Sequence, residues 1–282
     1  MSSADELCLA VDVGGTKLAT GLVDRAGRLS HRRQVPTPEE PWAALAPLVE
    51  ATMQEAPAAV VCGVGCGGPM DGDTVSPLNI PGWRGFPLRA ELAELTGLPT
   101  FVDNDAKALA LGEGWTGAAA GRREYMAMVV STGVGGGIVL DGRLLDGRLG
   151  NAGHVGHVIV VPDGRRCPCG ARGCLEAEAS GGAIAARTGR LAAEAPPDVV
   201  ERTGMLVGRA VADVANLLDL PLVVIAGSVA LGFGEPFFAA AQAEVDRSAR
   251  LDFSRGTRVV PAGLGDEGPL VGAAAVGWRG MA

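Results

Sequence analysis

The chain begins with short apolar runs separated by turns rich in glycine and aspartate. Leu7 to Val13 is apolar and contains β-branched residues, and two further runs follow after short turns, at Leu18 to Asp24 and Leu29 to Val35. Runs of this length bounded by such turns are typical of β-strands. The sequence therefore predicts a three-stranded meander at the start of the chain.

Helical stretches and short buried runs alternate through the rest of the chain. The spacing of apolar residues predicts helices at Pro41 to about Glu55, Arg89 to Leu95, from Asp105, Met205 to Leu218 and from about Gly268. Strands are predicted at Ala58 to Val64, Thr100 to Val102, Tyr125 to Val130, Ile138 to Leu140, Leu222 to Ala226 and Arg258 to Pro261. Each half opens with a strand, a glycine turn and a second strand. This recurrence predicts an α/β fold with two related lobes.

A stretch rich in Gly and Ala, Gly112 to Arg123, is the expected boundary between the lobes. We expect an N-terminal lobe over residues 1–117 and a C-terminal lobe over residues 118–282, which contains a loop-rich insert from about Gly142 to Ser180. The last helix, residues 268–282, is expected to pack back on the N-terminal lobe.

Composition indicates a globular protein with an acidic surface. Its 282 residues are 48% hydrophobic and 20% charged, which provides enough apolar material for a stable core. Subtracting 32 acidic from 24 basic residues gives a net charge of −8. An acidic surface argues against broad binding to nucleic acid or anionic membranes, because both depend on neutralising phosphate. A local phosphate site remains compatible with it.

The sequence shows no sign of membrane insertion or export. No uninterrupted apolar run approaches the roughly 20 residues of a membrane helix, and the N-terminus lacks a basic start and an apolar stretch. The six cysteines are bunched, and the chain is too long for a small disulfide-stapled protein. We therefore expect a cytoplasmic protein with reduced thiols and no membrane partner.

Two glycine turns follow predicted strands in a way that suits phosphate binding. In VDVGGTK, residues 11–17, and VVSTGVGGG, residues 129–137, the turn lacks Cβ atoms, so backbone N–H groups can approach a phosphate closely. Threonine hydroxyls, a lysine and an aspartate suited to hydrated Mg²⁺ accompany them. Each turn alone is also explained as a hairpin, but the pair favours nucleotide binding. The candidate phosphate-binding residues are Asp12, Gly14, Gly15, Thr16, Lys17, Thr132 and Gly133.

Two better-known nucleotide motifs do not apply. The chain contains neither GxxxxGKS nor GxxxxGKT, which excludes a P-loop NTPase. Residues Gly63 to Gly68 satisfy GxGxxG after a strand, but Pro69 and the turn Asp71-Gly72-Asp73 follow where the dinucleotide fingerprint requires a helix.

One histidine and three cysteines have the spacing of a zinc site. His157 is followed by Cys167, Cys169 and Cys174, and Gly170 and Gly173 supply bends between them. Three thiolates and one imidazole make a closed tetrahedral zinc site, which is structural because no position remains for water. A disulfide between Cys167 and Cys169 would close a strained ring. The remaining alternative is a cluster of thiols without a metal.

The segment Asp103-Asn104-Asp105 lies between a predicted strand and a predicted helix. Any of these side chains can cap the helix N-terminus, which the local sequence alone favours. The alternative is a carboxylate at the strand end that faces the cleft between lobes and acts as general base. Such a base accepts a hydroxyl proton during phosphoryl transfer.

Together these motifs resemble the ROK family of sugar kinases and repressors, which have the two-lobed actin-like ATPase (ribonuclease H-like) fold of hexokinase. DVGGTK and STGVGGG resemble its two phosphate turns, and Gly150 to His157 followed by CPCGARGCLE resembles its signature and zinc loop. The resemblance covers essentially the whole chain. It implies ATP-dependent phosphorylation of the 6-hydroxyl of a hexose or N-acetylhexosamine, Mg²⁺ bound with ATP, a structural Zn²⁺ and a homodimer.

The resemblance also implies roles for individual residues. Asp105 corresponds to the catalytic base, and Gly227 lies in the place of the glycine turn near the adenosine. The implied sugar-binding residues are Gly68, Asn79, Asn104, Asp105, His154, His157 and Glu176. The implied zinc ligands are His157, Cys167, Cys169 and Cys174.

His154 departs from many glucose-specific members, which carry Glu at this position of an E-x-G-H segment. A carboxylate only accepts hydrogen bonds from sugar hydroxyls, whereas a neutral imidazole offers one donor and one acceptor. The segment AGHVGH, residues 152–157, and the stretch Arg32 to Pro38 resemble bacterial N-acetylmannosamine kinases. This favours N-acetylmannosamine over glucose or kanosamine. The alternative is that His154 only packs against the zinc loop.

Three classes of function follow from the resemblance. The intact Asp105, Thr16, Lys17 and Thr132 favour a kinase over a non-catalytic sugar sensor. A repressor of this family carries a helix-turn-helix domain before the lobes, whereas here the first predicted strand starts at Leu7 and the net charge is negative. We therefore expect a sugar and ATP as partners, and no nucleic acid.

Overall fold

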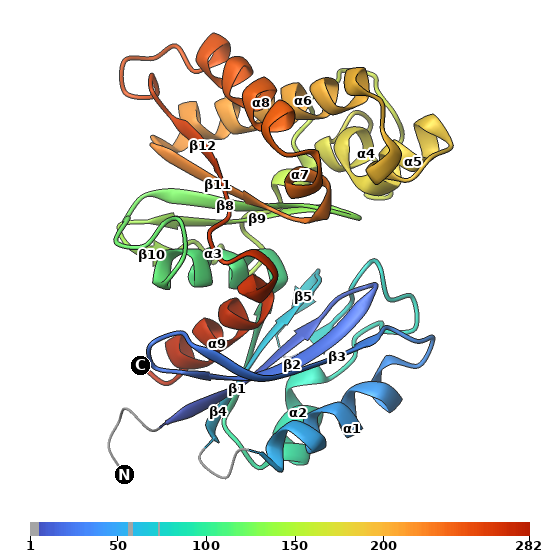
Figure 1. Ribbon diagram of the computed structural model, residues 1–282, viewed down its shortest axis with the longest axis vertical. Helices are drawn as coiled ribbons and strands as arrows, with labels where there is room; N and C mark the ends of the chain where they lie inside the picture. The colour runs from blue at the N-terminus through green and yellow to red at the C-terminus, as the bar shows by residue number, and fades with distance from the viewer. Residues whose placement is uncertain (1–5, 56–58, 73) are drawn as a thin grey trace. The chain divides into compact units, whose positions relative to one another are not determined.

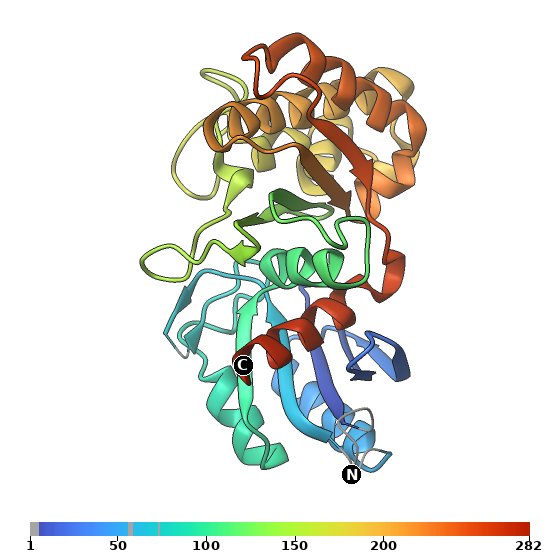
Figure 2. The same cartoon turned by 90° about the vertical axis from the view of Figure 1, so that its left-hand side faces the viewer.

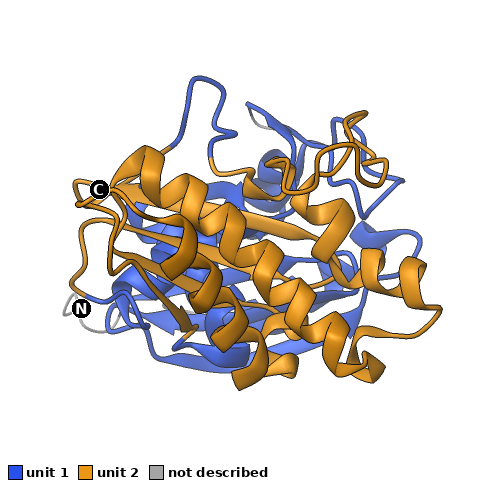
Figure 3. Ribbon diagram, turned by 90° about the horizontal axis from the view of Figure 1, so that it is seen from above, with its two compact units in different colours: residues 1–120, 146–152, 263–282 blue, residues 121–145, 153–262 orange. Residues whose placement is uncertain are grey.

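The computed structural model describes residues 6–55, 59–72 and 74–282 (Figure 1). The chain divides into two compact units, coloured separately in Figure 3. Unit 1 comprises Met1–Ala120, Asp146–Ala152 and Gly263–Ala282, and unit 2 comprises Gly121–Leu145 and Gly153–Ala262. The segment Asp146–Ala152, which was expected in the C-terminal lobe, groups with unit 1. We describe each unit by itself.

Unit 1 is built on a five-stranded mixed sheet. Its strand order is β3-β2-β1-β4-β7, with β1 antiparallel to β2 and parallel to β4, and β4 parallel to β7. The strands are β1 (Leu7–Val13), β2 (Lys17–Asp24), β3 (Leu29–Pro36), β4 (Ala59–Cys66) and β7 (Thr100–Asn104). A short ribbon, β5 (Met70–Asp71) and β6 (Thr74–Val75), follows β4. The predicted Ala58 and the turn residue Asp73 lie outside the described residues.

Alternation along β1 explains why helices cover both faces of this sheet. Leu9 and Val11 point into a core with α1 (Pro41–Met53) and α2 (Leu88–Thr96), whereas Ala10 packs against α9 (Gly268–Gly280) on the other face (Figure 1). Successive side chains of a strand point to opposite faces, so a strand that is apolar throughout is buried on both sides. Figure 2 shows α9 lying across the strands of this sheet.

Glycines bring α9 and its neighbours into close contact. A Cβ atom on Gly63 of β4 would collide with the carbonyl of Ala273 in α9. Gly112 in α3 (Asp105–Trp115) similarly permits contact with Gly272 of α9, where an added Cβ would lie 2.9 Å from the Gly272 nitrogen. The backbone can approach this closely only where no side chain intervenes. The helix that carries the candidate base is thereby packed firmly on α9.

Unit 2 repeats the same plan with a second five-stranded sheet. The order is β10-β9-β8-β11-β12, in which β8 is antiparallel to β9 and parallel to β11. Its strands are β8 (Tyr125–Val130), β9 (Val134–Leu140), β10 (Arg143–Leu144), β11 (Leu222–Ala226) and β12 (Arg258–Pro261). Two sheets that each combine an antiparallel hairpin with parallel strands confirm the predicted α/β class.

Two long helices cover the core of unit 2. They are α6 (Pro197–Leu218) and α8 (Glu235–Ser248), which pack where Gly204 and Gly208 let the α8 backbone approach. Shorter helices are α4 (Leu175–Ala179), α5 (Gly181–Thr188) and α7 (Ser228–Phe233), with single 3₁₀ turns at Val155–His157 and Ala192–Glu194; in unit 1, another lies at Gly265–Glu267. Among the described residues, no helix is both long and apolar enough to cross a membrane.

The second glycine run differs from its prediction. The sequence predicted a turn up to Gly137 and a strand from Ile138, but β9 already begins at Val134 and Gly135 pairs with Val129. A Cβ atom on Gly136 would lie 2.8 Å from Val155 and 3.2 Å from the carbonyl of Gly153. These glycines therefore make room for the segment before His157, and only Ser131–Gly133 forms the turn. The α6 helix also starts earlier than predicted, at Pro197.

Candidate functional site

The first glycine turn joins β1 to β2 and is held by its own backbone. The N–H of Gly14 donates to the carbonyl of Lys17 at 3.0 Å, and Thr37 donates its hydroxyl to the carbonyl of Gly14 at 2.7 Å. A Cβ atom on Gly15 would lie only 2.6 Å from the Cβ of Asn79. Glycine is therefore required at position 15, and the turn brings Asn79, a predicted sugar ligand, beside the predicted phosphate ligands.

Two predicted carboxylates meet at the carboxyl edge of the parallel strands of unit 1. In the strand register, Asp12 pairs with Gly65 and Gly65 pairs with Asp103. A Cβ atom on Gly65 would lie 3.7 Å from the Cα of Asp105 and 4.0 Å from Oδ1 of Asp12. Gly68 follows β4 at the same edge. Ligand sites of α/β sheets form at this edge, because loops after adjacent parallel strands converge there.

The proximity of these two groups affects their protonation. Burial, and after it the charge of Asp105, raise the pKa of Asp12 from 3.8 to about 7 against the opposing effects of Lys17 and Arg32. Burial of the carboxyl also raises the pKa of Asp105, and the hydrogen bond from the Ala106 N–H opposes this rise. The residue as a whole is exposed. A cation bound between the two would favour the ionised form of both carboxyls. Such a pair suits a divalent ion on one side and a proton acceptor on the other.

At the junction between β7 and α3, Asn104 and Asp105 both accept a hydrogen bond from the first turn of the helix. Asn104 is the N-cap of α3, and its side chain accepts a hydrogen bond from the Ala106 N–H at 3.1 Å. Asp105 is the first helical residue, and its Oδ1 accepts from the same N–H at 2.8 Å. Capping by Asn104 thus leaves the second carboxylate oxygen of Asp105 as a candidate acceptor of a substrate proton.

The Asp12 carboxyl predicts a pH-dependent stability. We expect Asp12→Asn to stabilise the protein more at pH 8 than at pH 5. The folded-state pKa of about 7 exceeds the ordinary value of 3.8, so protonated Asp12 contributes stability that is lost as pH rises through about 7. Asparagine cannot ionise and avoids that loss. Urea unfolding of wild type and Asp12→Asn at the two pH values, without nucleotide or Mg²⁺, gives the free energy of unfolding of each protein. The same difference in free energy at pH 5 and pH 8 would contradict the raised pKa of Asp12.

The second turn lies at the matching edge of the unit 2 sheet. It is closed by a hydrogen bond from the Ser131 N–H to the carbonyl of Gly133 at 2.9 Å, and the Ser131 and Ser228 hydroxyls lie 2.9 Å apart. Gly227 adopts a φ of 102°, and a Cβ there would collide with Val130. Parallel pairing of β8 with β11 therefore brings Gly227 beside the turn that contains Thr132 and Gly133.

Four side chains gather in unit 2 with the geometry of a zinc site. One ligand atom from each of His157, Cys167, Cys169 and Cys174 lies within 4.8 Å of the others. Cys167 Sγ is 3.6 Å from His157 Nδ1, and the Cys169 and Cys174 sulfurs are 3.7 Å apart. Ligands at zinc bond lengths around a tetrahedral centre lie about 3.6–3.8 Å apart. The donor set and its spacing therefore fit Zn²⁺.

The remaining predicted sugar ligands of unit 2 lie near this cluster. Glu176, in the first turn of α4, accepts a hydrogen bond from the Val134 N–H at 2.9 Å through Oε2. Gly156 packs against the carbonyl of Val134, and the His154 and His157 rings are 6.0 Å apart. Val134 at the start of β9 thus brings Glu176 and the loop 154–157 into one neighbourhood. His154 is exposed.

Comparison with known proteins decides the family. The sequence model of the ROK family matches residues 8–278. The chain belongs to the ROK family. An N-acetylmannosamine kinase from Citrobacter koseri is 42% identical over 80% of this chain and 84% of the relative.

Solved ROK structures share the same fold over nearly the whole chain. The ROK hexokinase of Thermus thermophilus has a TM-score of 0.84 and 36% identity, over 98% of this chain and 99% of that one. The ROK glucokinase of Streptomyces griseus, solved in complex with glucose and AMPPNP, has a TM-score of 0.85 and 33% identity, over 97% of this chain and 99% of that one. The two-lobed fold predicted from the resemblance is confirmed.

Within this ROK chain, the structure forms two groups of candidate residues. Unit 1 gathers Asp12, the first turn, Gly68, Asn79, Asn104 and Asp105 at one sheet edge. Unit 2 gathers the second turn with Gly227 at one place, and Glu176, the loop 154–157 and the cysteines at another. The individual binding roles remain predictions.

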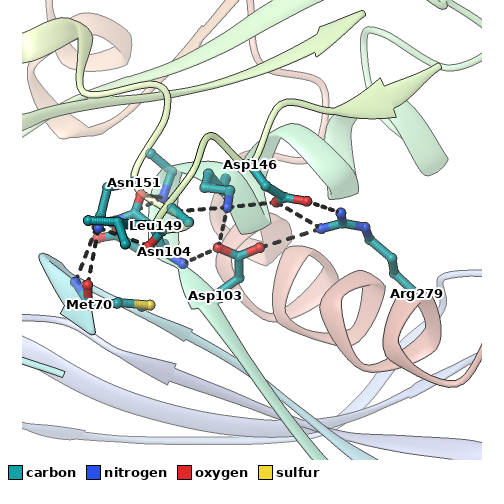
Figure 4. Close-up of polar contacts among 11 residues, drawn as sticks. Met70, Asp103, Asn104, Asp146, Leu149, Asn151 and Arg279 are labelled. Carbon is teal, nitrogen blue, oxygen red and sulfur yellow. Dashed lines mark hydrogen bonds and ion pairs between the residues drawn. The ribbon is translucent and has the colours of Figure 1, made fainter. Parts of the chain in front are cut away.

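Sequence reasoning missed a group of charged residues beside the candidate base. Lys107 is buried in unit 1 and contacts Asp103 and Asp146, and Arg279 also reaches both carboxylates (Figure 4). The spacing of Asp103 and Lys107, four apart across Asp105, was a visible signal. The contacts with Asp146 and Arg279 had no local signal.

Proposed function

We propose that the chain is an ATP-dependent kinase that phosphorylates the 6-hydroxyl of N-acetylmannosamine. The observation that carries the proposal is the pair of carboxyls at the edge of the unit 1 sheet, Asp12 and Asp105, separated by Gly65. Relatives named N-acetylmannosamine kinase, about two-fifths identical over most of their length, support the sugar.

Asp105 is proposed to accept the proton of the 6-hydroxyl. Its position at the first residue of α3 holds the carboxylate at a strand end, where Asn104 and one oxygen of Asp105 share the Ala106 N–H and the other oxygen of Asp105 is left for the substrate. The raised pKa makes it a better proton acceptor than an ordinary aspartate once it is ionised.

The two glycine turns are proposed to hold the triphosphate. Closed backbone turns with Thr16 and Thr132 offer N–H and hydroxyl donors, and Lys17 adds a positive charge. Asp12 would hold Mg²⁺ through its hydration shell, which neutralises the charge that develops on the phosphoryl group. Catalysis by these residues is mainly positioning and electrostatic stabilisation.

The sugar is proposed to be bound by the residues that the family resemblance implies, which are Gly68, Asn79, Asn104, Asp105, His154, His157 and Glu176. Glu176 already holds the start of β9 through one oxygen, so its other oxygen would meet the sugar. His154 would provide both a donor and an acceptor near C2, where an N-acetyl group presents an N–H and a carbonyl. A glutamate there would present acceptors only.

His154 therefore carries the prediction on specificity. We expect His154→Glu to shift the ratio of kcat/KM for N-acetylmannosamine over glucose by about tenfold toward glucose, which is about 1.4 kcal/mol. Steady-state ADP release across N-acetylmannosamine, N-acetylglucosamine, glucose and kanosamine measures the shift. His31→Gln, at an exposed histidine of β3, is the control and should leave every ratio unchanged. An unchanged ratio in His154→Glu would remove His154 from the specificity site.

Two alternative functions are separated by the same panel. A preference of the wild type for glucose, the ligand in the Streptomyces griseus glucokinase structure, or for kanosamine would replace the proposed substrate. Silence on every sugar would favour a non-catalytic sensor or a repressor-type member. The buried Asp12 beside Asp105 favours the kinase, since a sensor has no need for a carboxyl whose burial raises its pKa to about 7.

Zinc occupancy, a cytoplasmic location and a homodimer complete the proposal. The Cys₃His geometry supports zinc as a structural ion. Six free cysteines in the chain are consistent with a reducing compartment. The homodimer rests on the family resemblance.

A further inference from the structure

Lys107 is a buried lysine whose Nζ atom contacts three oxygen atoms. Its side chain is 2% exposed, and Nζ lies 2.8 Å from Asp103 Oδ1, 2.9 Å from Asp146 Oδ1 and 3.0 Å from the carbonyl of Gly150. The contacts with Asp146 and Gly150 are hydrogen bonds, and the contact with Asp103 is an ion pair. Such a site holds its three acceptors at fixed distances from one another.

Arg279 completes a charge-neutral cluster around Lys107. Its guanidinium lies 2.6 Å from Asp146 Oδ2 and 3.6 Å from Asp103 Oδ2, so both carboxylates are shared between the two cations (Figure 4). Burial raises the pKa of Asp146, but the hydrogen bonds from Arg279 and Lys107 outweigh it and leave the pKa below its ordinary value. These contacts therefore favour the ionised form of Asp146. We call Asp103, Lys107, Asp146 and Arg279 the Lys107 cluster.

The segment Asp146–Ala152 is fastened to unit 1 at both of its ends. The Lys107 cluster holds Asp146, and the side chain of Asn151 bonds the backbone of Met70 in both directions, at 3.2 Å and 3.1 Å (Figure 4). Met70 follows the predicted sugar ligand Gly68 by two residues. The seven-residue segment thus connects the first turn of α3, the strand after Gly68 and the chain that continues into the loop 154–157.

The Lys107 cluster spans the candidate base. Asp103 and Lys107 lie two residues before and two residues after Asp105, and their ion pair fixes the junction from which the Asp105 side chain projects. A buried ion pair adds little net stability compared with apolar side chains of similar size, because removing its charges from water is costly. What such a cluster provides is a defined geometry, since each charge accepts only one arrangement of partners.

We propose that Lys107 and Asp146 are positioning residues of the phosphotransfer reaction. They fasten the segment 146–152 to the first turn of α3, so that the base Asp105 and the strand that follows Gly68, both in unit 1, are held in a fixed relation. Neither side chain is assigned a contact with substrate. This inference rests on the proposed kinase function. One of its tests, hydrogen exchange of the segment 146–152, does not depend on that function.

Asp146→Ala is the variant that tests the proposal, because the Asp146 side chain is 46% exposed and its loss should leave the protein folded. We expect kcat to fall about tenfold, with the KM for ATP within about twofold of wild type. Asp252→Ala, which removes a comparable aspartate–arginine contact (3.2 Å to Arg255), is the matched control and should leave kcat unchanged. A wild-type kcat in Asp146→Ala would overturn the proposal, as would a fall explained by a smaller folded fraction.

A double-mutant cycle distinguishes positioning from separate contributions to folding. Arg279→Ala and Asp146→Ala should lower kcat together by less than the product of their separate effects, because both act on one contact. Independent, multiplying effects would contradict a shared role. Arg279 is also half-exposed, so this cycle does not depend on replacing the buried Lys107.

Hydrogen exchange tests the attachment of the segment 146–152 without reference to catalysis. In Asp146→Ala, amides of residues 146–152 should exchange about tenfold faster than in wild type, while the Asp252→Ala control should not change them. Unchanged exchange in this segment would overturn the inference. If the wild type phosphorylates no sugar, the proposed function fails, and the exchange result still decides whether the Lys107 cluster holds the segment.

Discussion

Asp105→Asn is expected to lower kcat by about a thousandfold while the dissociation constant for the sugar changes by less than about tenfold, about 1.4 kcal/mol. Asparagine retains the size of the side chain and an oxygen that can accept the Ala106 N–H, so α3 keeps its first turn. It cannot accept a proton from the 6-hydroxyl. Steady-state ADP release gives kcat, and titration calorimetry gives the sugar affinity.

Asp141→Asn is the matched control for this prediction. Asp141 lies in unit 2 with a side chain that is 90% exposed, so the same chemical change should leave kcat and sugar affinity unchanged. Turnover near the wild-type rate in Asp105→Asn would exclude Asp105 as the base. A parallel collapse of sugar binding would instead show that its carboxylate serves mainly to hold the sugar.

Removal of zinc is expected to lower the melting temperature by about 10 °C and to raise the KM for the sugar more than the KM for ATP. Cys174 precedes α4 directly, and Glu176 two residues later bonds the start of β9. Without the metal, the loop from His157 to Cys174 loses its common anchor, which loosens Glu176 and the segment with His154. The metal is thus expected to act on sugar binding without taking part in the chemical step.

A strong chelator and the variant Cys174→Ser provide two routes to the same test, read by metal analysis and thermal melting. Cys62→Ser is the control, because it makes the same exchange at a buried cysteine outside the cluster. This variant should retain the zinc ion. Restoring zinc to the chelated wild type should recover melting temperature and sugar KM together. Unchanged melting and turnover after proven loss of the metal would refute a structural zinc site.

Local pattern was sufficient for the parts of the fold that depend on neighbouring residues. The apolar run Leu7 to Val13 is a strand with the predicted bounds, because every side chain after the half-buried Leu7 enters the core. Asp12 and Asp105 fall at strand ends, and parallel strands necessarily bring such ends to one edge. The clustering of His157 with three cysteines followed from donor type and spacing, and the loop glycines Gly170 and Gly173 do adopt positive φ.

Contacts between distant residues were beyond the reach of the sequence. Lys107 reads as an ordinary charge in an Ala-rich helix, and its burial depends on Asp146 and Arg279, which are 39 and 172 positions away. Gly135 to Gly137 reads as a flexible turn, yet close packing of Gly153 and Val155 explains the missing side chain at Gly136. The chain's return to unit 1 at Asp146–Ala152 follows from these same contacts.

The most direct test of the central claim is a coupled ADP-release assay of the wild type with N-acetylmannosamine, followed by identification of the phosphorylated carbon by NMR. The account predicts ATP-dependent turnover with the phosphate on the 6-hydroxyl and a higher kcat/KM than for glucose, N-acetylglucosamine or kanosamine. No turnover on any of these sugars, or a phosphate on another carbon, would contradict it.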